Sequence, residues 1–387
     1  MADNVKRVAV MGSTGSIGVN ALEVIAASEG RLQAVALTAH SRLDELAAQA
    51  KRFRPRWVVA SNAKVAAKFD RKLLPRGCEF LKGPDALVEV ARQADVDVVL
   101  AGIVGRAGLE STWAALDEGK TVALANKETM VMAGELVSEL IKKKGGRLLP
   151  VDSEHSALFQ ALSAGKTSEV ARLILTASGG PFKDLPLHEL QQITVAEALA
   201  HPTWDMGPKI TIDSATMMNK ALEIVEARWL FGVDAAKIAV VIHPQSVVHS
   251  LVEFIDGSVI AQMSPPDMRL PIQYALHYPD RVNGVAKRID WRQTLHLNFD
   301  PPDRDRFPAI ALGEEAAKVG GTAGAVLNAA NEAAVQSFLD GDLHFTEIVP
   351  ASRSILKAHN HESRPTLEQL VKLDKWARQE VSRWVCA

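Results

Sequence analysis

Short runs of apolar residues alternate with stretches of helical periodicity through the first 150 residues, and this alternation constrains the fold more than any other feature of the chain. The apolar runs are RVAVMG, LQAVALTA, PRWVVAS, DVDVVLAGIVG, TVALANKE and GRLLPVDSE. Near-continuous apolar strands separated by helices are typical of a parallel sheet that is covered on both faces. The sequence therefore predicts an α/β fold with an N-terminal, Rossmann-like parallel sheet.

The pattern changes after residue 150. ARLILTAS and KITIDSA are typical of buried strands that end in polar residues, and SVVHSLVEFIDGSVIAQMS predicts a hairpin with Asp256 and Gly257 at its turn. Residues 278–307 are rich in Pro, Asp and Arg, which indicates a linker. The tail predicts a small helical bundle, whose last helix begins with a capping box of Thr366 and Gln369.

Composition narrows the class of protein. A chain of 387 residues is too long for one ordinary core, and its net charge of -2 gives no reason to expect nucleic acid or an anionic membrane as a partner. The two cysteines, Cys78 and Cys386, are far apart, which argues against a disulfide framework and suits a reducing compartment. No apolar run is long enough to span a bilayer, and the first strand follows the N-terminus too closely for a signal peptide. We expect a cytoplasmic protein.

A glycine-rich loop follows the first predicted strand. Gly12, Gly15 and Gly18 form a G-x-x-G-x-x-G pattern, a spaced variant of the dinucleotide fingerprint, in which backbone amides at a helix N-terminus approach a pyrophosphate. An NAD site usually places an acid after the second strand, but this chain has His40, Ser41 and Arg42 there. Because Ser and Arg would accept a 2′-phosphate, NADP is favoured; the alternative is that Arg42 is merely solvated.

Polar residues follow two later strands. ALANKE places Asn126, Lys127 and Glu128 where open α/β sheets bind ligands, which favours site residues; the alternative is a plain helix start with Glu128 in its first turn. Asp152 and Glu154 are two residues apart in an expected extended segment, so their side chains would point the same way. Two neighbouring carboxylates repel unless a cation or proton lies between them, and Mg²⁺ or Mn²⁺ prefers such oxygens.

Segment 214–230 predicts a helix with a polar face. Asn219, Lys220 and Glu223 share that face, and Ser214 would lie at the helix N-terminus, where amides favour an anion. Glu223 would then bind a cation while the other three hold a phosphate; the alternative is a solvated helix face. TASGGPF at 176–182 is a small-residue turn that could hold a phosphate, and the loop at 198–209 is a candidate lid, in which Trp204 is either mobile or a buried anchor.

These segments together resemble the 1-deoxy-D-xylulose 5-phosphate reductoisomerase family. The motifs that carry the resemblance are GSTGSIG, ALANKE, PVDSEHSA, TASGGPF, HPTWDMG, KITIDSATMMNKALEIVEA, VIHPQSVVHS and LNAANEAAV, in the family's order. The resemblance implies an oxidoreductase that uses NADPH and Mg²⁺ or Mn²⁺, with Co²⁺ as an alternative, in non-mevalonate isoprenoid precursor synthesis. It also implies a homodimer of subunits with an NADPH-binding domain, a metal- and substrate-binding catalytic domain and a C-terminal helical domain, which we place at 1–150, 151–277 and 308–387, with a linker at 278–307.

The resemblance also implies roles for single residues. Metal ligands would be Asp152, Glu154 and Glu223, and the catalytic set would add Lys127 and His249. Further substrate contacts would be Ser153, Ser178, His201, Trp204, Ser214, Asn219 and Lys220. Cofactor contacts would be Thr14, Gly15, Ser16, Ile17, Ser41, Arg42, Asn126, Glu128 and Gly207. The family often has Gly, Lys and Asn after the second strand, and this chain departs from that pattern at residues 39–42.

The implied reaction rearranges 1-deoxy-D-xylulose 5-phosphate and reduces the product to 2-C-methyl-D-erythritol 4-phosphate. A divalent ion would polarise the carbonyl, and the grip on the remote phosphate would orient the reacting end. Two other functions stay open on the residues alone. A semialdehyde dehydrogenase would need a nucleophilic thiol, for which neither cysteine is well placed, and a non-catalytic NADP sensor would use the acidic cluster only structurally.

Overall fold

The structure is a computed structural model that describes residues 5–200, 204 and 206–386. The chain forms two compact units, each assembled from separate stretches of sequence. Unit 1 comprises Met1–Thr129, Val137–Ser156 and Asp267–Lys287, and unit 2 comprises Met130–Leu136, Ala157–Pro266 and Arg288–Ala387. The domain boundaries drawn from the sequence stay predictions, because a compact unit does not by itself assign a ligand to a segment.

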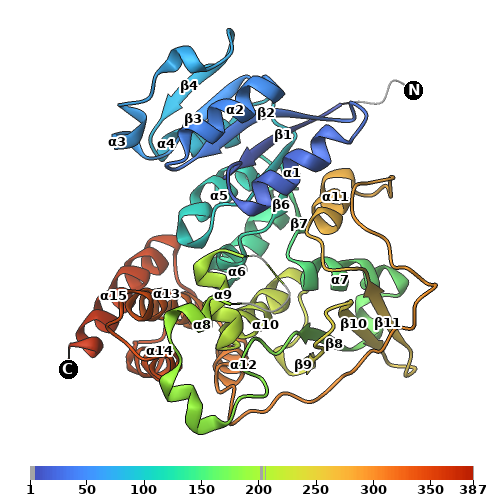
Figure 1. The fold of residues 1–387 in the computed structure, drawn as a ribbon, viewed down its shortest axis with the longest axis vertical. Helices are drawn as coiled ribbons and strands as arrows, with labels where there is room; N and C mark the ends of the chain where they lie inside the picture. The colour runs from blue at the N-terminus through green and yellow to red at the C-terminus, as the bar shows by residue number, and fades with distance from the viewer. Residues whose placement is uncertain (1–4, 201–203, 205, 387) are drawn as a thin grey trace. The chain divides into compact units, whose positions relative to one another are not determined.

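Unit 1 is built on the predicted parallel sheet, which is confirmed. Its strands are β1 (Lys6–Met11), β2 (Leu32–Ala39), β3 (Trp57–Ala60), β4 (Glu79–Lys82), β5 (Val98–Ala101), β6 (Thr121–Leu124) and β7 (Arg147–Pro150). All neighbours are parallel, in the order β4-β3-β2-β1-β5-β6-β7 (Figure 1). The chain direction across the sheet reverses between β1 and β5, and open α/β sheets bind ligands outside the carboxyl ends of the strands at such a point.

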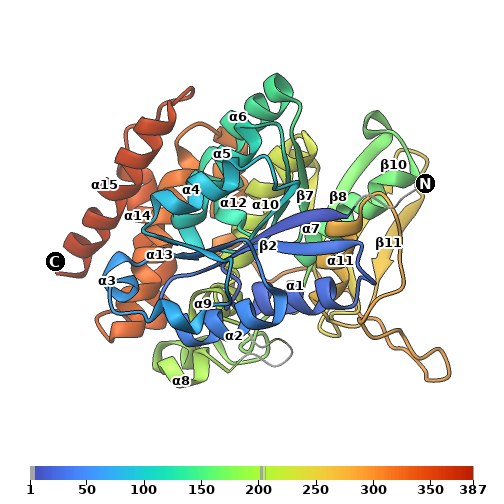
Figure 2. The same ribbon diagram turned by 90° about the horizontal axis from the view of Figure 1, so that it is seen from above.

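Helices cover both faces of this sheet. They are α1 (Ser16–Ala26), α2 (Leu43–Phe53), α3 (Ala63–Ala66), α4 (Asp85–Arg92), α5 (Leu109–Asp117), the long α6 (Lys127–Lys144) and α11 (Arg269–His277). Figure 2 shows α1 and α2 on one side of the strands and α4 and α5 on the other. Burial on both faces explains the near-continuous apolar strands, since Val8, Ala9, Val10 and Met11 of β1 are all fully buried.

Hydrogen bonds from Lys6 join the end of α11 to the start of β1. The ammonium group of Lys6 donates to the carbonyl oxygens of Leu276 at 3.3 Å and Tyr278 at 2.9 Å. His277, which lies between Leu276 and Tyr278 in the sequence, is buried. Burial lowers the pKa of His277 from its ordinary 6.5, and the positive charges of Lys6 and Arg31 lower the pKa further. The folded state therefore holds this imidazole neutral where the unfolded chain would protonate it.

We expect His277 to make unit 1 less stable in mild acid. Its depressed pKa means that its contribution to the free energy of unfolding is present above 6.5 and is lost as the pH falls. In His277→Gln, the urea midpoint should depend less on pH between about pH 8 and about pH 5 than in the wild type. His188→Gln, which changes a side chain 82% exposed, is the control and should keep the wild-type slope. Equal slopes for all three proteins would contradict the prediction.

Unit 2 contains a four-stranded sheet. Its strands are β8 (Val170–Ala177), β9 (Ile238–Ile242), β10 (Val248–Phe254) and β11 (Val259–Met263), in the order β11-β10-β8-β9. The β10–β11 hairpin is confirmed, and Gly257 in its turn has a φ of 86°, which glycine adopts most readily. β8 and β9 pair in parallel, so this sheet is mixed.

The segment KITIDSA is a helix, and its prediction as a strand was wrong. The structure has α7 (Ser153–Ala161), α8 (Val195–Ala198), α9 (Pro208–Ala215) and α10 (Met218–Phe231) in this region. β-Branched residues suggested a strand, but Pro208 occupies the first turn of α9 and Gly207 precedes it, an arrangement that starts helices well. Buried packing of one side of α9 then outweighs the weak intrinsic preference for strand.

The predicted helical tail is confirmed. It consists of α12 (Ala309–Val319), α13 (Ala323–Asp340), α14 (Ile348–Ala358) and α15 (Leu367–Val385). The capping box of α15 is present, since Thr366 and Gln369 each accept a hydrogen bond from the other's backbone amide. Residues 278–307 contain an isolated bridge between Asp300 and Ile242 but no regular helix or strand. Over the residues described, no helix combines the length and the apolar character needed to cross a membrane.

Candidate active site

The glycine loop joins β1 to α1 at the point where the strand order reverses. Gly12 has a φ of +80°, and a Cβ atom at Gly18 would lie 2.3 Å from the carbonyl oxygen of Gly12. Gly15 is the residue before α1 and provides no side-chain cap for its first amides. A backbone that tolerates no side chain at Gly18 and presents a bare helix N-terminus fits a bound pyrophosphate.

The first three residues after β2 are polar, and none of them is an acid. His40 lies with its Nδ1 atom 3.1 Å from the hydroxyl of Ser61, and Ser41 is exposed. Arg42 is about half exposed and forms an ion pair with Glu45 at 3.4 Å. Exposed ion pairs of this kind contribute little, so the guanidinium group can exchange that carboxylate for a phosphate at small cost.

Asn126 caps the start of α6. Its Oδ1 atom accepts from the amide of Thr129 at 3.0 Å, and its Nδ2 atom donates to the carbonyl oxygens of Ile103 at 2.6 Å and Gly105 at 2.8 Å. Glu128 lies in the first turn of α6, as in the plain helix start that the sequence left open. Asn126 therefore ties the segment after β5 to the segment after β6, at the carboxyl ends of the strands.

The acidic segment after β7 is a helix start, so the predicted extended conformation was wrong. β7 ends at Pro150 and α7 begins at Ser153, which places Glu154 in the first turn, where the helix dipole favours an acid. The two carboxylates still meet, because an oxygen atom of Asp152 lies within 4.8 Å of one of Glu154. Ser153 donates its hydroxyl to Glu154 at 2.5 Å.

Lys127 forms an ion pair with one of these two acids, Asp152. Its Nζ atom is 2.6 Å from the Oδ2 atom of Asp152, and the two side chains are only 6% and 14% exposed. A buried ion pair costs desolvation on both sides and is weak evidence for a purely stabilising role. The carboxyl ends of β6 and β7 thus bring one ammonium group and two carboxylates of unit 1 into one small region.

Helix α10 of unit 2 has the predicted polar face. Glu223 accepts a hydrogen bond from Asn219 Nδ2, four residues earlier, at 2.6 Å. Glu223 also forms an ion pair with Lys220, three residues earlier, so all three side chains lie on one side of the helix. The Lys220 and Glu223 side chains are 3% and 0% exposed. A fully solvated helix face is thereby excluded for these two residues.

Ser214 does not lie at the N-terminus of that helix, contrary to the prediction. It belongs to the last turn of α9, and α10 begins at Met218 after Met217, whose φ of 61° breaks the helical path. Ser214 nevertheless lies beside the turn that follows β8. A Cβ atom at Gly180 would be 2.8 Å from the carbonyl oxygen of Ser214, and Ser178 accepts from the amide of Gly180 at 3.2 Å.

Two aromatic rings of unit 2, those of His249 and Trp204, lie close together. His249 on β10 is buried, with its Nε2 atom 2.9 Å from the hydroxyl of Ser264. The half-buried ring of Trp204 lies 6.5 Å from the His249 ring, centroid to centroid. Trp204 is therefore in contact distance of a predicted site residue. His201, also predicted to contact substrate, lies outside the described residues.

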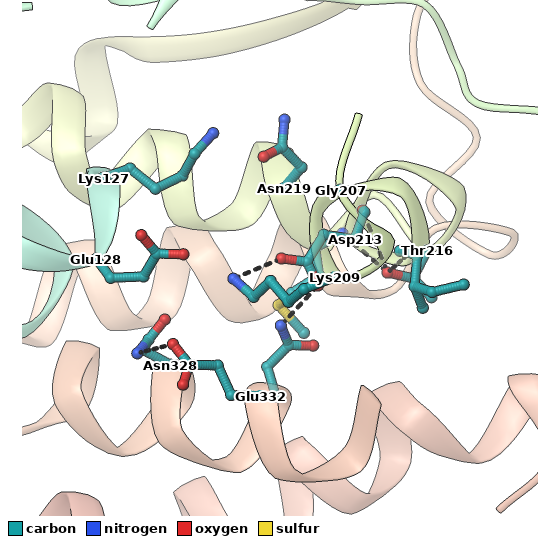
Figure 3. A network of polar contacts seen from close by, with 12 residues as sticks. Lys127, Glu128, Gly207, Lys209, Asp213, Thr216, Asn219, Asn328 and Glu332 are labelled. Atoms are coloured by element: carbon teal, nitrogen blue, oxygen red, sulfur yellow. Dashed lines mark hydrogen bonds and ion pairs between the residues drawn. The ribbon is translucent and has the colours of Figure 1, made fainter. Parts of the chain in front are cut away.

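Sequence reasoning missed one buried polar cluster, which Figure 3 shows. Asp213 on α9 pairs with Lys209 at 2.8 Å and accepts from Asn331 of α13 at 2.7 Å. The signal was the i,i+4 spacing of Lys209 and Asp213, which places both on one helix face. Predicting a strand for KITIDSA hid that spacing.

Comparisons with known proteins agree over nearly the whole chain. The family model for 1-deoxy-D-xylulose 5-phosphate reductoisomerase matches residues 8–134, its C-terminal domain model matches 148–231, and a second C-terminal domain model matches 263–380. Proteins of that name from Rhodopirellula baltica and Geobacter metallireducens are each 50% identical over 97% of this chain, covering 94% and 98% of those proteins.

Solved structures of similar proteins extend the match to three dimensions. The reductoisomerase from Zymomonas mobilis in complex with NADPH has a TM-score of 0.92 at 42% identity, covering 99% of both chains. A reductoisomerase structure in complex with NADPH, fosmidomycin and magnesium has a TM-score of 0.92 at 41% identity, covering 98% of both chains. Full-length identity of this degree, on the fold and polar clusters described above, shows that the chain belongs to the 1-deoxy-D-xylulose 5-phosphate reductoisomerase family.

Proposed function

We propose that this chain carries out the reaction of its family. It rearranges 1-deoxy-D-xylulose 5-phosphate and reduces the product with NADPH to 2-C-methyl-D-erythritol 4-phosphate, in a divalent-metal-dependent reaction of isoprenoid precursor synthesis. The observation that carries the proposal is that predicted site residues form two ammonium–carboxylate pairs, Lys127 with Asp152 and Lys220 with Glu223. The chain that holds these pairs matches the family along its length.

Asp152, Glu154 and Glu223 are the proposed metal ligands. Asp152 and Glu154 belong to unit 1, with carboxylate oxygens close together, and Glu223 belongs to unit 2. Three carboxylates without a thiol or imidazole suit a hard ion such as Mg²⁺ or Mn²⁺. When bound, the ion would polarise the substrate carbonyl as a Lewis acid.

The cofactor is proposed to bind along the β1–α1 loop of unit 1. Amides of the bare helix N-terminus would hold the pyrophosphate, and Arg42 with Ser41 would hold the 2′-phosphate. The full set of proposed contacts is Thr14, Gly15, Ser16, Ile17, Ser41, Arg42, Asn126, Glu128 and Gly207. Asn126 and Glu128 are buried at the carboxyl end of β6, where a nicotinamide ring would be positioned off the sheet edge.

The substrate phosphate is proposed to bind in unit 2. Ser178 and Ser214 lie on adjoining turns, and the α10 face provides the amide of Asn219 and the ammonium of Lys220. Lys220 is buried, and a buried cation interacts more strongly with an anion than an exposed one does. Holding the phosphate away from the reacting carbons supplies binding energy that orients those carbons.

Other side chains act at the reacting end of the substrate. Ser153 would contact substrate hydroxyls, and Lys127 would donate its ammonium hydrogens to the developing oxyanion. His249 and Trp204, together with His201, would cover the substrate and exclude water from a reactive intermediate. NADPH, when bound, would supply the hydride for the reduction of the rearranged aldehyde.

The alternative of a semialdehyde dehydrogenase finds no support at either cysteine. Cys78 is half-buried and donates its thiol to the carbonyl oxygen of Pro55 at 2.9 Å, and burial raises its pKa, which lowers its nucleophilicity at neutral pH. Cys386 lies exposed at the end of α15, next to the C-terminus.

The metal-restoration assay tests the proposal directly. NADPH oxidation with 1-deoxy-D-xylulose 5-phosphate should stop after chelation and return when Mn²⁺ or Mg²⁺ is added in excess. NADPH should still bind the chelated protein, as measured by calorimetry, because its proposed contacts lie on the β1–α1 loop. Turnover that survives complete metal removal would rule out the metal-dependent reaction, and NADPH binding without any turnover would favour the NADP sensor.

A cytoplasmic homodimer is the proposed state of the protein. Support for self-association comes from the edge strand β11, where Val259 and Ile260 are exposed, and from the nearby turn residue Ile255, which is 71% exposed. An unpaired edge strand with apolar side chains readily pairs with a second copy. Light scattering that gives the mass of one chain would contradict the dimer, and fractionation that places the protein outside the cytoplasm would contradict the location.

A further inference from the structure

Asp213 occupies a position that helix α9 alone does not explain. It lies in the last turn of the helix, where the dipole disfavours an acid, and its side chain is only 1% exposed. Burying a carboxylate costs free energy unless charged or hydrogen-bonding partners compensate. The reason for an acid here must therefore lie in what it contacts.

Those contacts join α9 to the C-terminal bundle. Lys209, one turn earlier on α9, supplies the positive charge at 2.8 Å (Figure 3). The Nδ2 atom of Asn331 on α13 donates to Asp213 at 2.7 Å. Asn331 is fully buried. Apolar contacts between helices are not directional, whereas a single buried hydrogen bond fixes which side of a helix faces its neighbour. A shift of one residue in that register would turn α9 by about 100°.

The orientation of α9 determines where Ser214 points, because Ser214 directly follows Asp213. The carbonyl of Ser214 packs so closely on Gly180 that a Cβ atom there would lie 2.8 Å away. Beyond α9, Thr216 accepts from the amide of Met218 at 3.3 Å, and Met217 has a φ of 61°. This fixed junction leads directly into the α10 face with Asn219 and Lys220.

We propose that Asp213 and Asn331 are positioning residues that hold α9 on α13 and thereby set the geometry of the phosphate pocket. The inference rests on the proposed role of Ser214, Asn219 and Lys220 in binding the substrate phosphate. It assigns the C-terminal bundle a function in substrate affinity although none of the proposed substrate contacts lies on α13. Lys209 serves as the counter-charge that allows Asp213 to be buried.

The test uses the full-length enzyme and separates KM from kcat. Asn331→Leu keeps the size of the side chain but removes the donor. It should raise the KM for 1-deoxy-D-xylulose 5-phosphate and the Ki of inorganic phosphate by roughly tenfold, the effect expected for one lost buried hydrogen bond. The kcat and the KM for NADPH should stay within about twofold of wild type, because no metal ligand or cofactor contact changes.

Arg378→Met is the matched control. Arg378 on α15 donates to Glu332 of the same helix α13 at 2.5 Å and to Asp374 at 3.0 Å, so its loss weakens the same bundle without touching α9. It should lower the melting temperature and leave the KM for the substrate unchanged. Equal KM increases in both variants would show a general loss of stability and would overturn the proposal.

A rescue experiment covers the case in which Asn331→Leu folds poorly. Exchanging the pair, as Asp213→Asn with Asn331→Asp, restores a donor facing a carboxylate with the direction reversed. The double variant should have a lower KM than Asp213→Leu, which removes the acceptor. A KM as high as in Asp213→Leu would overturn the positioning role of Asp213 and Asn331. Lys220→Ala distinguishes an error in the proposed phosphate pocket from an error in the proposed positioning role of Asp213 and Asn331. If Lys220→Ala leaves the KM unchanged, the phosphate pocket is wrongly assigned. If Lys220→Ala raises the KM while Asn331→Leu does not, only the positioning role of Asp213 and Asn331 is wrong.

Discussion

Glu223→Gln is expected to lower kcat by about 100-fold or more, which corresponds to about 2.7 kcal/mol of lost transition-state stabilisation. The change keeps the shape of the side chain and one oxygen for Asn219, which now lies 2.6 Å from the carboxylate. It removes the negative charge that the proposed ion requires. The loss should be partly relieved at high Mn²⁺ concentration, so kcat is measured as a function of Mn²⁺.

A stability control is needed because Glu223 also neutralises a buried lysine. Breaking a buried ion pair destabilises a protein, so the melting temperature of Glu223→Gln should fall. Glu332→Gln removes another carboxylate paired to a cation, Arg378, within unit 2, and it should reduce stability without changing the Mn²⁺ dependence. If Glu223→Gln at saturating Mn²⁺ stays within about tenfold of wild-type turnover, roughly 1.4 kcal/mol, Glu223 is not a principal ligand.

Lys220→Ala is expected to raise the KM for 1-deoxy-D-xylulose 5-phosphate by about 100-fold, with a smaller fall in kcat. The ammonium group is 3% exposed, so it is held in a region where its attraction for a phosphate is little screened by water. Removing it takes away binding energy shared by the ground state and the transition state. Steady-state kinetics with varied substrate at saturating NADPH measure the change.

Lys237→Ala provides the matched loss of a cation. Lys237 lies in the same unit and donates to the carbonyl oxygen of Val170, at the start of β8, at 2.8 Å, and it is not one of the proposed substrate contacts. Its removal should leave the KM for the substrate unchanged. A Lys220→Ala enzyme with the KM of the wild type would contradict the phosphate role, and an equal rise in both variants would show that the effect is not specific to α10.

The two lysine–carboxylate pairs suggest how the site tolerates its own charge. Lys127 forms an ion pair with Asp152 and Lys220 forms one with Glu223, so each of these two acids has a cation beside it within its own unit. The same cations are the groups proposed to contact substrate oxygens. When substrate binds, each lysine would therefore exchange its carboxylate partner for a substrate oxygen. This exchange limits the desolvation cost of a highly charged site.

The sequence was most reliable where a period or a turn signal repeats. Strands of unit 1 are buried on both faces, so their apolar runs identify a parallel sheet without reference to contacts. Gly257 at the β10–β11 turn and Thr366 at the start of α15 act through neighbouring backbone, and both predictions are confirmed. Asn219 and Glu223 share a helix face for the same local reason.

The errors arose where two elements meet. Asp152 and Glu154 follow a strand so closely that an extended path was expected, but α7 begins at Ser153 and brings the carboxylates together by a helical turn instead. Ser214 was placed at the start of a helix that in fact begins four residues later. Boundaries of this kind depend on packing against distant residues, which local preference does not report.

The sequence by itself determined the parallel sheet, the glycine loop, the polar face of α10 and the membership of a family, because each is encoded in short-range spacing or in motifs read in order. Only the tertiary structure decided that KITIDSA is a helix and that Asp213 is buried against Asn331, 118 residues further along the chain. The physical reason is that the burial of α9 and one hydrogen bond to α13 outweigh the weak strand preference of its β-branched residues.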